Sequence, residues 1–248
     1  MSAADAIAAK PRTLDLAGGL VPAIERLIGR LSRVGDQPFF PVGAFPWVGD
    51  VEAFYPAIRG EMLDLLRRSA PIPGFEQIST DQTKLSDDRR WKTFFFLGYG
   101  ERFEDNIARC PATWTALRRI PGLTTAFFSV LEPGKRLPPH RGPYKGVLRY
   151  HLGVIIPENA EACGIQVDCQ QRRWSEGQSL IFDDTFVHSA WNDSDERRIV
   201  LFVDFARPLR FPANLINRAI LKVIARSGYV QEAKVNYRQW KAAQVLPG

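Results

Sequence analysis

The chain has 248 residues, of which 45% are hydrophobic and 24% are charged, and its formal net charge is +6. This size and balance predict a globular protein with a substantial core and exclude a wholly disordered chain. No apolar run approaches the roughly 20 residues that a membrane-spanning helix needs. The first residues lack the apolar stretch that follows a basic start in secretory signals, so we expect a cytoplasmic protein.

The positive charge is dispersed along the chain, without a basic block or a nucleic-acid-binding motif. We therefore expect no nucleic-acid partner, whereas an anionic small molecule or an anionic membrane surface agrees with the charge. The three cysteines are few and odd in number, which indicates free thiols in a reducing compartment. Cys163 and Cys169 match no familiar metal-binding pair. No pattern in the chain predicts an oligomeric state.

The N-terminal part of the chain predicts helices. Residues 20–33 have helical periodicity, and residues 50–70 form a stronger amphipathic pattern that "PIPGF" ends. The apolar stripe of this second helix comprises Val51, Phe54, Ile58, Met62, Leu65 and Leu66. Next, "RRWKTFFFLGYG" at 89–100 predicts a buried strand, and "CPATWTALRRIPG" at 110–122 predicts a short helix between turn residues.

From about residue 124 the sequence becomes rich in short β-type runs separated by Gly, Pro, Asn and Asp. They are "TTAFFSVLEPG", "VLRYHLGVIIP", "CGIQVDCQQRRW", "SLIFDD" and "RRIVLFVDFARP". Such a series predicts an antiparallel sandwich or barrel, of which the jelly roll is one form. The fold expected is therefore α+β, in a single domain over 1–248. Residues 1–75 are mainly helical, 76–210 form the jelly-roll core, and 211–248 form a helical extension.

Residues 214–226 in that extension predict a helix with one apolar stripe. Arg218, Lys222 and Arg226 lie beside the stripe. Most helices of this kind pack their apolar stripe on the domain, which is what we expect here. A basic amphipathic helix can also lie on an anionic membrane, and peripheral contact with the inner membrane face remains an alternative.

Strand periodicity places several charged residues on defined faces. Alternate residues of a strand point the same way, so Arg149 and His151 share one face, as do Arg198 and Asp204. Arg197 then points to the opposite face from Arg198. An arginine that points inward needs an anionic partner, because an unpaired buried charge is costly. Bidentate pairing with arginine is a good way to hold a small diacid.

The three histidines raise the question of a metal site. His140 and His151 lie in "LPPHRGPYKGVLRYHLG", and His188 follows "SLIFDD". Two histidines and one carboxylate commonly hold non-haem iron, and in many such enzymes the acid stands two residues after the first histidine. Here that position is Gly142. The residues alone leave open a broken metal site, a complete site of another kind, and histidines that are merely hydrogen-bonded.

Residues 124–208 resemble the aspartyl/asparaginyl β-hydroxylase family, a branch of the iron(II)- and 2-oxoglutarate-dependent oxygenases. The matching stretches are "FSVLEPG", "PPHRGP", "LRYHLGVIIP", "W-x-EG" at 174–177, "LIFDDTFVHSAWN" and "RRIVLFVDFARP", in this order and with compatible spacing. "WKTFFF" at 91–96 is also similar to the bacterial members. The resemblance implies a double-stranded β-helix, a cupin-like jelly roll, which agrees with the strand-rich interpretation.

The resemblance implies that the metal is bound by two histidines only. His140 and His188 match the family's iron ligands, and no catalytic residue is expected beyond the metal centre. The family's eukaryotic members also lack the third protein ligand, so Gly142 does not imply a broken site. Either water or Asp184 fills the third ligand position. Asp184 is otherwise expected to support a ligand histidine or the local structure.

The resemblance also implies a binding site for 2-oxoglutarate. Arg198 matches the arginine that pairs with the distal carboxylate of this cosubstrate, and Ser129 matches a serine that hydrogen-bonds the same carboxylate. Arg149 and His151 match the pair near the metal-chelating end of the cosubstrate. Iron(II), 2-oxoglutarate and O2 are therefore the expected cofactors and cosubstrates.

The reaction implied is hydroxylation of an unactivated C–H bond, with a β-carbon as the expected position. Family members act on Asp or Asn side chains of proteins, on acyl chains of bacterial lipids, and on small acids or amino acids. The N-terminal part and "RGPYKGVLRYHLG" resemble the lipid-hydroxylating members, so we expect a lipid or small-molecule substrate. The alternatives are a protein or peptide side-chain hydroxylase, a non-catalytic jelly-roll binding protein, and a zinc-dependent jelly-roll enzyme.

Overall fold

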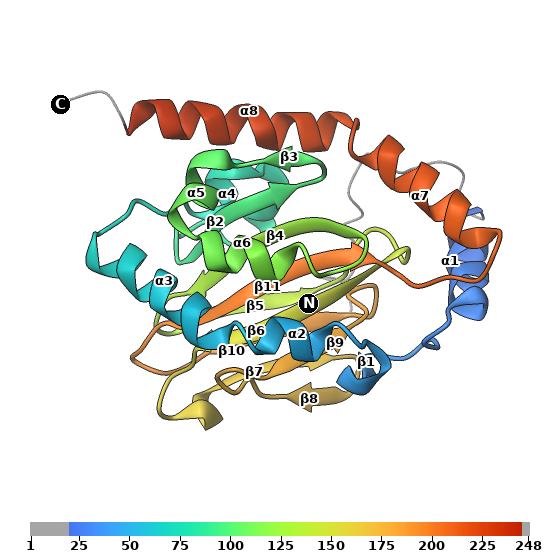
Figure 1. The fold of residues 1–248 in the computed structure, drawn as a ribbon, viewed down its shortest axis with the longest axis horizontal. Coiled ribbons are helices and arrows are strands. Elements are labelled where there is room, and N and C mark those ends of the chain that lie inside the picture. Colours follow the sequence, from blue (N-terminus) through green and yellow to red (C-terminus); the bar gives the residue numbers. More distant parts are fainter. Residues whose placement is uncertain (1–19, 245–248) are drawn as a thin grey trace, which may run out of the picture.

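Two antiparallel β-sheets face each other in the computed structural model, which describes residues 20–244 (Figure 1). The larger sheet has the strand order β1-β9-β6-β11-β4-β2-β3, and the smaller has the order β5-β10-β7-β8. With helices around them, the two sheets confirm the expected α+β jelly-roll fold. The parts of the expected helical ends at 1–19 and 245–248 lie outside the described residues.

The strands of the larger sheet are longest at its centre. In spatial order they are β1 (Phe39–Phe40), β9 (Ser179–Phe182), β6 (Val147–Ile155), β11 (Arg198–Ala206), β4 (Leu123–Leu131), β2 (Trp91–Gly98) and β3 (Glu101–Arg102). Those of the smaller sheet are β5 (Lys135–His140), β10 (His188–Asn192), β7 (Cys163–Val167) and β8 (Gln170–Arg172). The edge strands β1, β3 and β8 have only two or three residues, so they leave little unpaired backbone.

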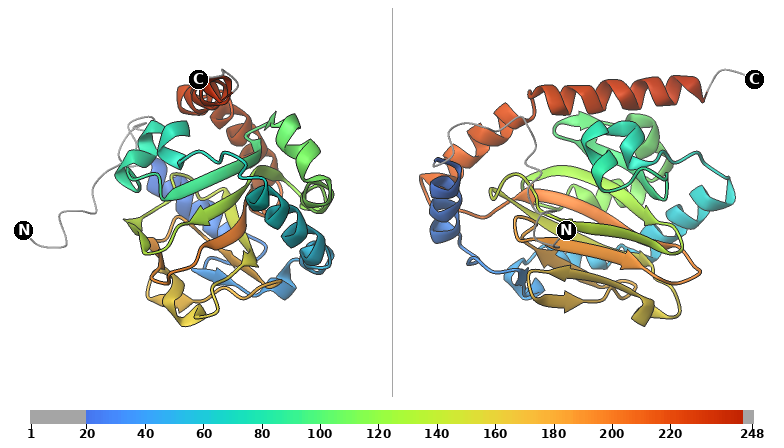
Figure 2. Two further views of the ribbon diagram at one scale, coloured as in Figure 1. Left: turned by 90° about the vertical axis from the view of Figure 1, so that its left-hand side faces the viewer. Right: turned by 180° about the vertical axis from the view of Figure 1, so that it is seen from behind.

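Helices surround the larger sheet and one end of the molecule (Figures 1 and 2). The α-helices are α1 (Leu20–Leu31), α2 (Val48–Glu52), α3 (Tyr55–Arg67), α4 (Phe75–Ile78), α5 (Glu104–Arg109), α6 (Pro111–Leu117), α7 (Ala213–Ile224) and α8 (Gly228–Ala243). The 3-10 helices are η2 (Val42–Ala44), η3 (Thr80–Lys84) and η4 (Ala160–Ala162). The chain leaves the core through α7, and α8 then runs back past α4.

The single helix predicted over 50–70 is wrong in one respect, because the structure divides this segment into α2 and α3. Pro56 occupies the first turn of α3. Proline has no N–H to donate to the carbonyl of Glu52, so a continuous helix would lose a hydrogen bond there. Similarly, the helix predicted over 20–33 ends at Leu31, and Ser32 forms a β-bridge with Leu209.

The larger sheet separates two apolar cores. On β11, Leu201 and Val203 pack toward α2, α3 and α6, whereas Val200 and Phe202 pack toward the smaller sheet. Arg198 lies on the same face as Val200, as strand alternation predicts. The candidate site residues therefore point into the space between the two sheets.

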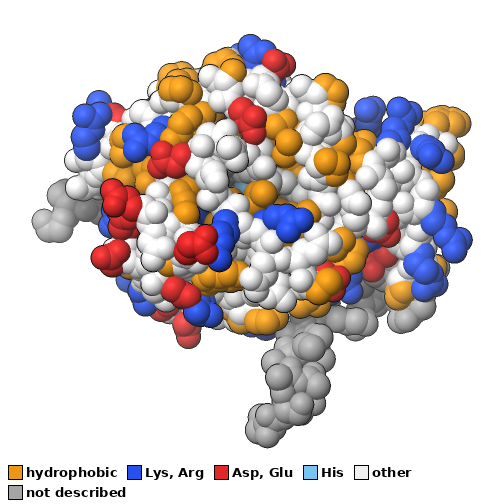
Figure 3. Space-filling model, turned by 90° about the horizontal axis from the view of Figure 1, so that it is seen from below, with side chains coloured by type: hydrophobic (Ala, Val, Ile, Leu, Met, Phe, Trp, Pro, Cys, Tyr) orange, Lys and Arg blue, Asp and Glu red, His pale blue; other side chains and the backbone are white. Residues whose placement is uncertain are grey.

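The cysteines and the charge distribution agree with the sequence. The three thiols are free; Cys110 and Cys163 are buried and Cys169 is exposed. Lys and Arg side chains are spread over the face shown in Figure 3, with Asp and Glu among them over much of it. Within residues 20–244, no helix is both long enough and apolar enough to cross a membrane.

Candidate active site

His140 and His188 lie opposite each other on neighbouring strands. His140 is the last residue of β5, His188 is the first of β10, and their ring centroids are 4.1 Å apart. The Nδ1–H of His140 donates to the carbonyl of Pro138 at 2.8 Å, and that of His188 donates to Phe186 at 3.0 Å. These bonds leave Nε2 of each ring as the unprotonated nitrogen that a metal requires.

Both rings are held in the neutral form. Burial and, to a smaller extent, the nearby Arg149 guanidinium lower the pKa of His140 to about 4, although the hydrogen bond to Pro138 opposes the shift. Burial, His140 and Arg149 together hold the pKa of His188 well below its ordinary value. Neutral imidazole is the form that binds metal ions, so no proton has to be displaced near pH 7. The pair fits a metal ion by its chemistry.

Asp184 follows β9 and lies against the loop after His140. The N–H of Gly142 donates to the Asp184 carbonyl at 2.7 Å, and any side chain at position 142 would collide with the Asp184 carboxylate. Glycine is required here by this close approach. Burial raises the pKa of Asp184 to about 6, although Arg149 opposes the shift.

Asp184 does not join the histidines in a three-ligand set. No group of three or more His, Cys, Asp or Glu side chains within residues 20–244 is placed to hold a metal ion. Its Oδ2 instead lies 2.8 Å from Nη2 of Arg149, and its Oδ1 has no hydrogen-bond partner in the described part of the chain. The protein therefore offers a metal two histidines, with Asp184 held beside them.

Arg149 is fully engaged by acids. Its Nε and Nη2 donate to the two carboxylate oxygens of Asp204 at 2.9 and 3.2 Å, and it also pairs with Asp184. Its guanidinium carbon lies 4.2 Å from the ring centroid of Phe202. Burial alone would lower the pKa of Arg149, but the two carboxylates raise it. Arg149 thus holds Asp184 in place. Strand alternation predicted that Asp204 shares a face with Arg198, but it gave Asp204 no role.

Arg198 has the opposite environment. It is 2% exposed, and its Nε and Nη1 have no hydrogen-bond partner among the described residues. Its guanidinium carbon lies 4.6 Å from the ring centroid of Trp174, and burial lowers its pKa to about 9. A buried cation without an anion is unstable, so this position calls for an anionic ligand. Trp174 belongs to the "W-x-EG" stretch, but its contact with Arg198 required the tertiary structure.

Ser129 and His151 complete the inner surface. The indole N–H of Trp91 donates to Oγ of Ser129 at 3.0 Å, so the Ser129 hydroxyl keeps its own proton to donate. Neither ring nitrogen of His151 has a hydrogen-bond partner within residues 20–244. Burial, and then the charges of Arg198, Arg149 and His188, hold the pKa of His151 well below the ordinary value.

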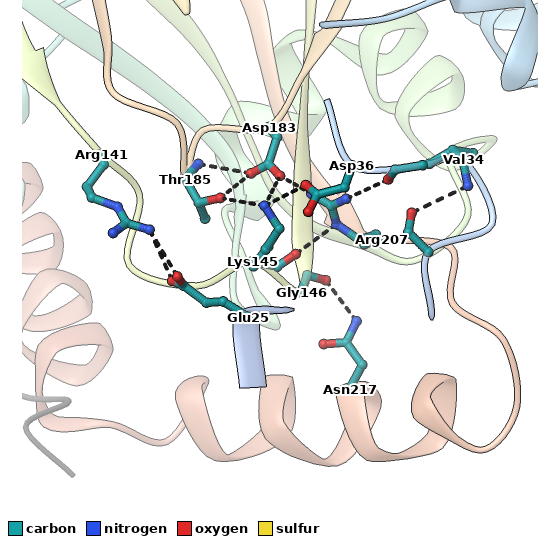
Figure 4. A network of polar contacts seen from close by, with 12 residues as sticks. Glu25, Val34, Asp36, Arg141, Lys145, Gly146, Asp183, Thr185, Arg207 and Asn217 are labelled. Carbon is teal, nitrogen blue, oxygen red and sulfur yellow. Dashed lines mark hydrogen bonds and ion pairs between the residues drawn. The ribbon is translucent and has the colours of Figure 1, made fainter. Parts of the chain in front are cut away.

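A buried ionic network supports the loop that carries Asp184 and leads to His188 (Figure 4). The Asp183 carboxylate accepts hydrogen bonds from the Thr185 backbone at 3.0 Å and from Lys145 at 3.0 Å, and it pairs closely with Arg207. Lys145 also pairs with Asp36 at 2.7 Å. The sequence did not predict this network, because its members are far apart in the chain and only the tertiary structure brings them together.

The comparisons with known proteins identify the family. Residues 52–208 match the family described as "Aspartyl/Asparaginyl beta-hydroxylase". This chain belongs to the aspartyl/asparaginyl β-hydroxylase family. The resemblance predicted from the sequence is thereby confirmed, and the activities named for its relatives support a hydroxylase.

Among its relatives, "Ornithine lipid ester-linked acyl 2-hydroxylase" of Rhizobium tropici is 47% identical over 222 residues, covering 90% of this chain and 79% of that protein. Human "Aspartyl/asparaginyl beta-hydroxylase" is 34% identical over 192 residues, covering 74% of this chain but 24% of the human protein. A crystal structure of a Pseudomonas putida prolyl-4-hydroxylase is 14% identical. It has a TM-score of 0.37 and covers 62% of this chain and 87% of that one.

Proposed function

We propose that this protein is an iron(II)- and 2-oxoglutarate-dependent dioxygenase that hydroxylates an acyl chain of a lipid. The proposal is supported mainly by two features that lie between the same two sheets. They are a pair of neutral histidines and the unpaired guanidinium of Arg198. The first is suited to a metal ion, and the second is suited to a carboxylate. A metal ion together with a diacid that chelates it would use both groups, whereas a metal ion alone or a carboxylate alone would use only one of them.

His140 and His188 would hold the iron through Nε2. The hydrogen bonds from their Nδ1 atoms to backbone carbonyls fix the tautomer and the orientation of each ring. Asp184 is tied to Arg149, so this chain would contribute only the two histidines to the iron. The iron, once bound with 2-oxoglutarate and oxygen, supplies the oxidising power for hydroxylation of an unactivated C–H bond.

Arg198 would bind the distal carboxylate of 2-oxoglutarate. The strand register makes Ser129 its diagonal neighbour on the same face, since Arg198 pairs with Leu131 and Ser129 pairs with Val200. The Ser129 hydroxyl can therefore donate to the same carboxylate. Trp174 covers the guanidinium and excludes water, which strengthens a charge-assisted hydrogen bond. His151, with both ring nitrogens unpaired, is left to contact the rest of the cosubstrate.

The substrate class rests on similarity. A relative that shares 47% identity over 90% of this chain is named for hydroxylation at position 2 of an ester-linked acyl chain of ornithine lipid. We propose the same class of substrate here. A small acid or amino acid, or a protein side chain as in the human relative's name, are the other outcomes to be distinguished by experiment.

The reaction class is tested by anaerobic titration of the protein with iron(II) and 2-oxoglutarate. A weak visible charge-transfer band is expected when both are present, and His140→Ala should abolish it along with bound iron. If the folded wild-type protein gives no band at saturating iron and cosubstrate, the oxygenase proposal fails. A zinc enzyme or a non-catalytic binding protein would then become the better interpretation.

The substrate is tested under oxygen-18 gas with separate lipid, metabolite and peptide fractions from cells. Mass spectrometry should find one added oxygen-18 atom on an ornithine-lipid acyl chain, dependent on 2-oxoglutarate. Label that appears only in the metabolite or peptide fraction would overturn the lipid assignment and leave the reaction class intact.

A further inference from the structure

The apolar stripe of α7 faces solvent. The chain from Phe211 into the helix exposes 74% of Phe211, 52% of Leu215, 57% of Ile216 and 68% of Val223. Residues 215, 219 and 223 are four apart, so they form one row along the helix surface, and the exposed Phe211 lies just before the helix begins. The expectation that this helix packs its apolar stripe on the domain is therefore wrong for these residues.

A polar residue anchors the opposite side of α7. Asn217 is buried; its Nδ2 donates to the Gly146 carbonyl at 2.8 Å, and its Oδ1 accepts from the Tyr144 hydroxyl at 2.7 Å. Leu221 is buried one turn further on. The anchor fixes which way the helix is turned, and it holds the apolar row outward. This is the reverse of the usual arrangement for a surface helix, whose polar face meets water.

Cations line the exposed row on one side. Arg218, Lys222 and Arg226 are also four apart, and none of them forms an ion pair with another described residue. Residues 205–231 contain no Asp or Glu. An uncompensated positive row beside an apolar row complements an anionic lipid surface, in which headgroups meet the cations and acyl chains meet the apolar side chains.

The end of α1 adjoins this surface. The N–H of Arg33 donates to the Pro208 carbonyl at 2.9 Å, and the N–H of Arg210 donates to the Leu31 carbonyl at 2.9 Å. Leu27 of α1 is 55% exposed. In Figure 3, Lys and Arg side chains gather at the right-hand end of the molecule, with hydrophobic side chains between them. That end corresponds to α1 and α7 in Figure 1.

We propose that α7 is a docking surface for an anionic phospholipid membrane. The docking surface consists of Phe211, Leu215, Ile216, Arg218, Lys222, Val223 and Arg226. This inference rests on the proposed lipid substrate, and it adds the means by which the enzyme reaches it. Asn217, which anchors α7, binds the loop between β5 and β6, and this loop begins directly after His140. Docking through α7 therefore brings the histidine-bearing end of the two sheets next to the lipid surface.

The test is sedimentation of the full-length, metal-free protein with vesicles. One set is phosphatidylcholine alone, and the other is an equimolar mixture of phosphatidylcholine and phosphatidylglycerol. We expect binding to the anionic vesicles that weakens as salt is raised, and little binding to the neutral ones. Equal binding to both sets, or binding to neither, would overturn the docking surface.

The charge contribution is tested by replacing Arg218, Lys222 and Arg226 together with Gln. Each cation near an anionic surface contributes about 1 kcal/mol, so affinity for the mixed vesicles should fall on the order of a hundred-fold. The matched control replaces three exposed cations elsewhere with Gln, namely Arg67, Arg68 and Lys84. Unchanged vesicle affinity in the first variant, or an equal loss in the control, would contradict the proposal.

The apolar contribution is tested by Val223→Ser on α7, with Val235→Ser on α8 as the matched control. Val235 is 48% exposed, so neither change disturbs the core, and circular dichroism should show both variants folded. Vesicle affinity should fall several-fold for the first variant only. If the exposed row is instead covered by a second copy of the chain, light scattering will show a dimer that Val223→Ser dissociates, and the membrane proposal fails.

The docking surface and the proposed function fail in different ways. Wild-type protein that binds anionic vesicles, but adds no oxygen to ornithine lipid included in them when iron(II), 2-oxoglutarate and O2 are supplied, would contradict the lipid substrate and leave the docking surface supported. Wild-type protein that hydroxylates dispersed lipid but binds no vesicle would contradict the docking surface and support the lipid substrate.

Discussion

The carboxylate of Asp184 fills the space beside the α-carbon of Gly142, two residues after His140. In many iron sites the residue at this position is itself the third ligand. In this chain an acid from another loop lies there, and it is turned toward Arg149. Gly142 is thus a requirement for placing Asp184, and the two positions are coupled.

Gly142→Ala should test this coupling. The added methyl group meets the Asp184 carboxylate, so the free energy of unfolding should fall by about 1–3 kcal/mol, as for other overpacked sites. In an Asp184→Ala background the same change should cost much less, because contacting residues are not additive. Denaturant unfolding of the four proteins of this cycle measures both costs. Equal costs in the two backgrounds would show that the residues are not coupled.

Arg198→Met should separate stability from cosubstrate binding. Without 2-oxoglutarate the change removes an unpaired buried charge, so the melting temperature should stay the same or rise. Affinity for 2-oxoglutarate should fall on the order of a hundred-fold, because the carboxylate loses its buried partner. Anaerobic titration and thermal melts with and without 2-oxoglutarate measure the two effects.

The adjacent Arg197 is the control for that experiment. It points to the opposite face, is half-exposed, and pairs with Glu132 at 2.9 Å. Arg197→Met should leave the affinity for 2-oxoglutarate unchanged. A loss of similar size in both variants would count against a specific role for Arg198.

Asp183→Asn should destabilise the protein strongly. It leaves Arg207 and Lys145 buried beside a neutral amide, and breaking one partner of a buried ion pair costs about 3–5 kcal/mol. Asp193→Asn offers a matched comparison, since Asp193 pairs with Arg136 at the surface. That change should cost less than about 1 kcal/mol. Urea unfolding measures both, and similar small costs would mean that the buried network adds little.

Stability of the metal-free protein should fall as pH is lowered from about 6.5 toward about 4. Folding lowers the pKa of His140 to about 4 and those of His151 and His188 well below the ordinary value. Within this window the unfolded chain binds protons that the folded chain does not, so acid favours unfolding. Each histidine contributes up to about 1.4 kcal/mol per pH unit.

Asp184 has the opposite effect on the free energy of unfolding in the same pH range. Its pKa is raised to about 6 by burial, so the folded chain binds this proton more readily than the unfolded chain does, and acid stabilises it. Three histidines outweigh one carboxyl, and the net effect should still be destabilising. Urea unfolding between pH 7 and pH 5 checks this, with His151→Leu expected to flatten the dependence. A free energy of unfolding that does not change with pH would contradict the lowered pKa values of the three histidines.

Local patterns in the chain predicted much of the fold, and they predicted which site residues share a strand face. Strand alternation is a property of the backbone, so it was enough to put Arg149 with His151, and Arg198 with Asp204, on common faces, but it did not decide which face is the inner one. Of the apolar stripe predicted over residues 50–70, Val51, Ile58, Met62 and Leu65 are buried, whereas Phe54 and Leu66 are partly buried against the same core. The stripe missed the break at Pro56 because periodicity counts side chains and not backbone donors.

The partners of the buried charges depended on contacts between distant segments. Arg149 and Asp204 are 55 residues apart in the chain, and only the strand register brings them together. The same register leaves Arg198 beside Trp174 without an acid. From the sequence these two arginines look alike, since both are inward residues of long strands. One holds a carboxylate of the protein, and the other is left for a ligand.

Helix α7 shows the same division between local and distant information. Its composition predicted an amphipathic helix, and the helix is present over Ala213–Ile224. Its rotation was decided by Asn217, which finds Tyr144 and Gly146 on the loop after His140. Local sequence thus determined which elements form and which faces they have. Tertiary contacts decided which charges are neutralised and which apolar face stays in water. Both depend on which residues from distant parts of the chain lie against the charged group or the helix.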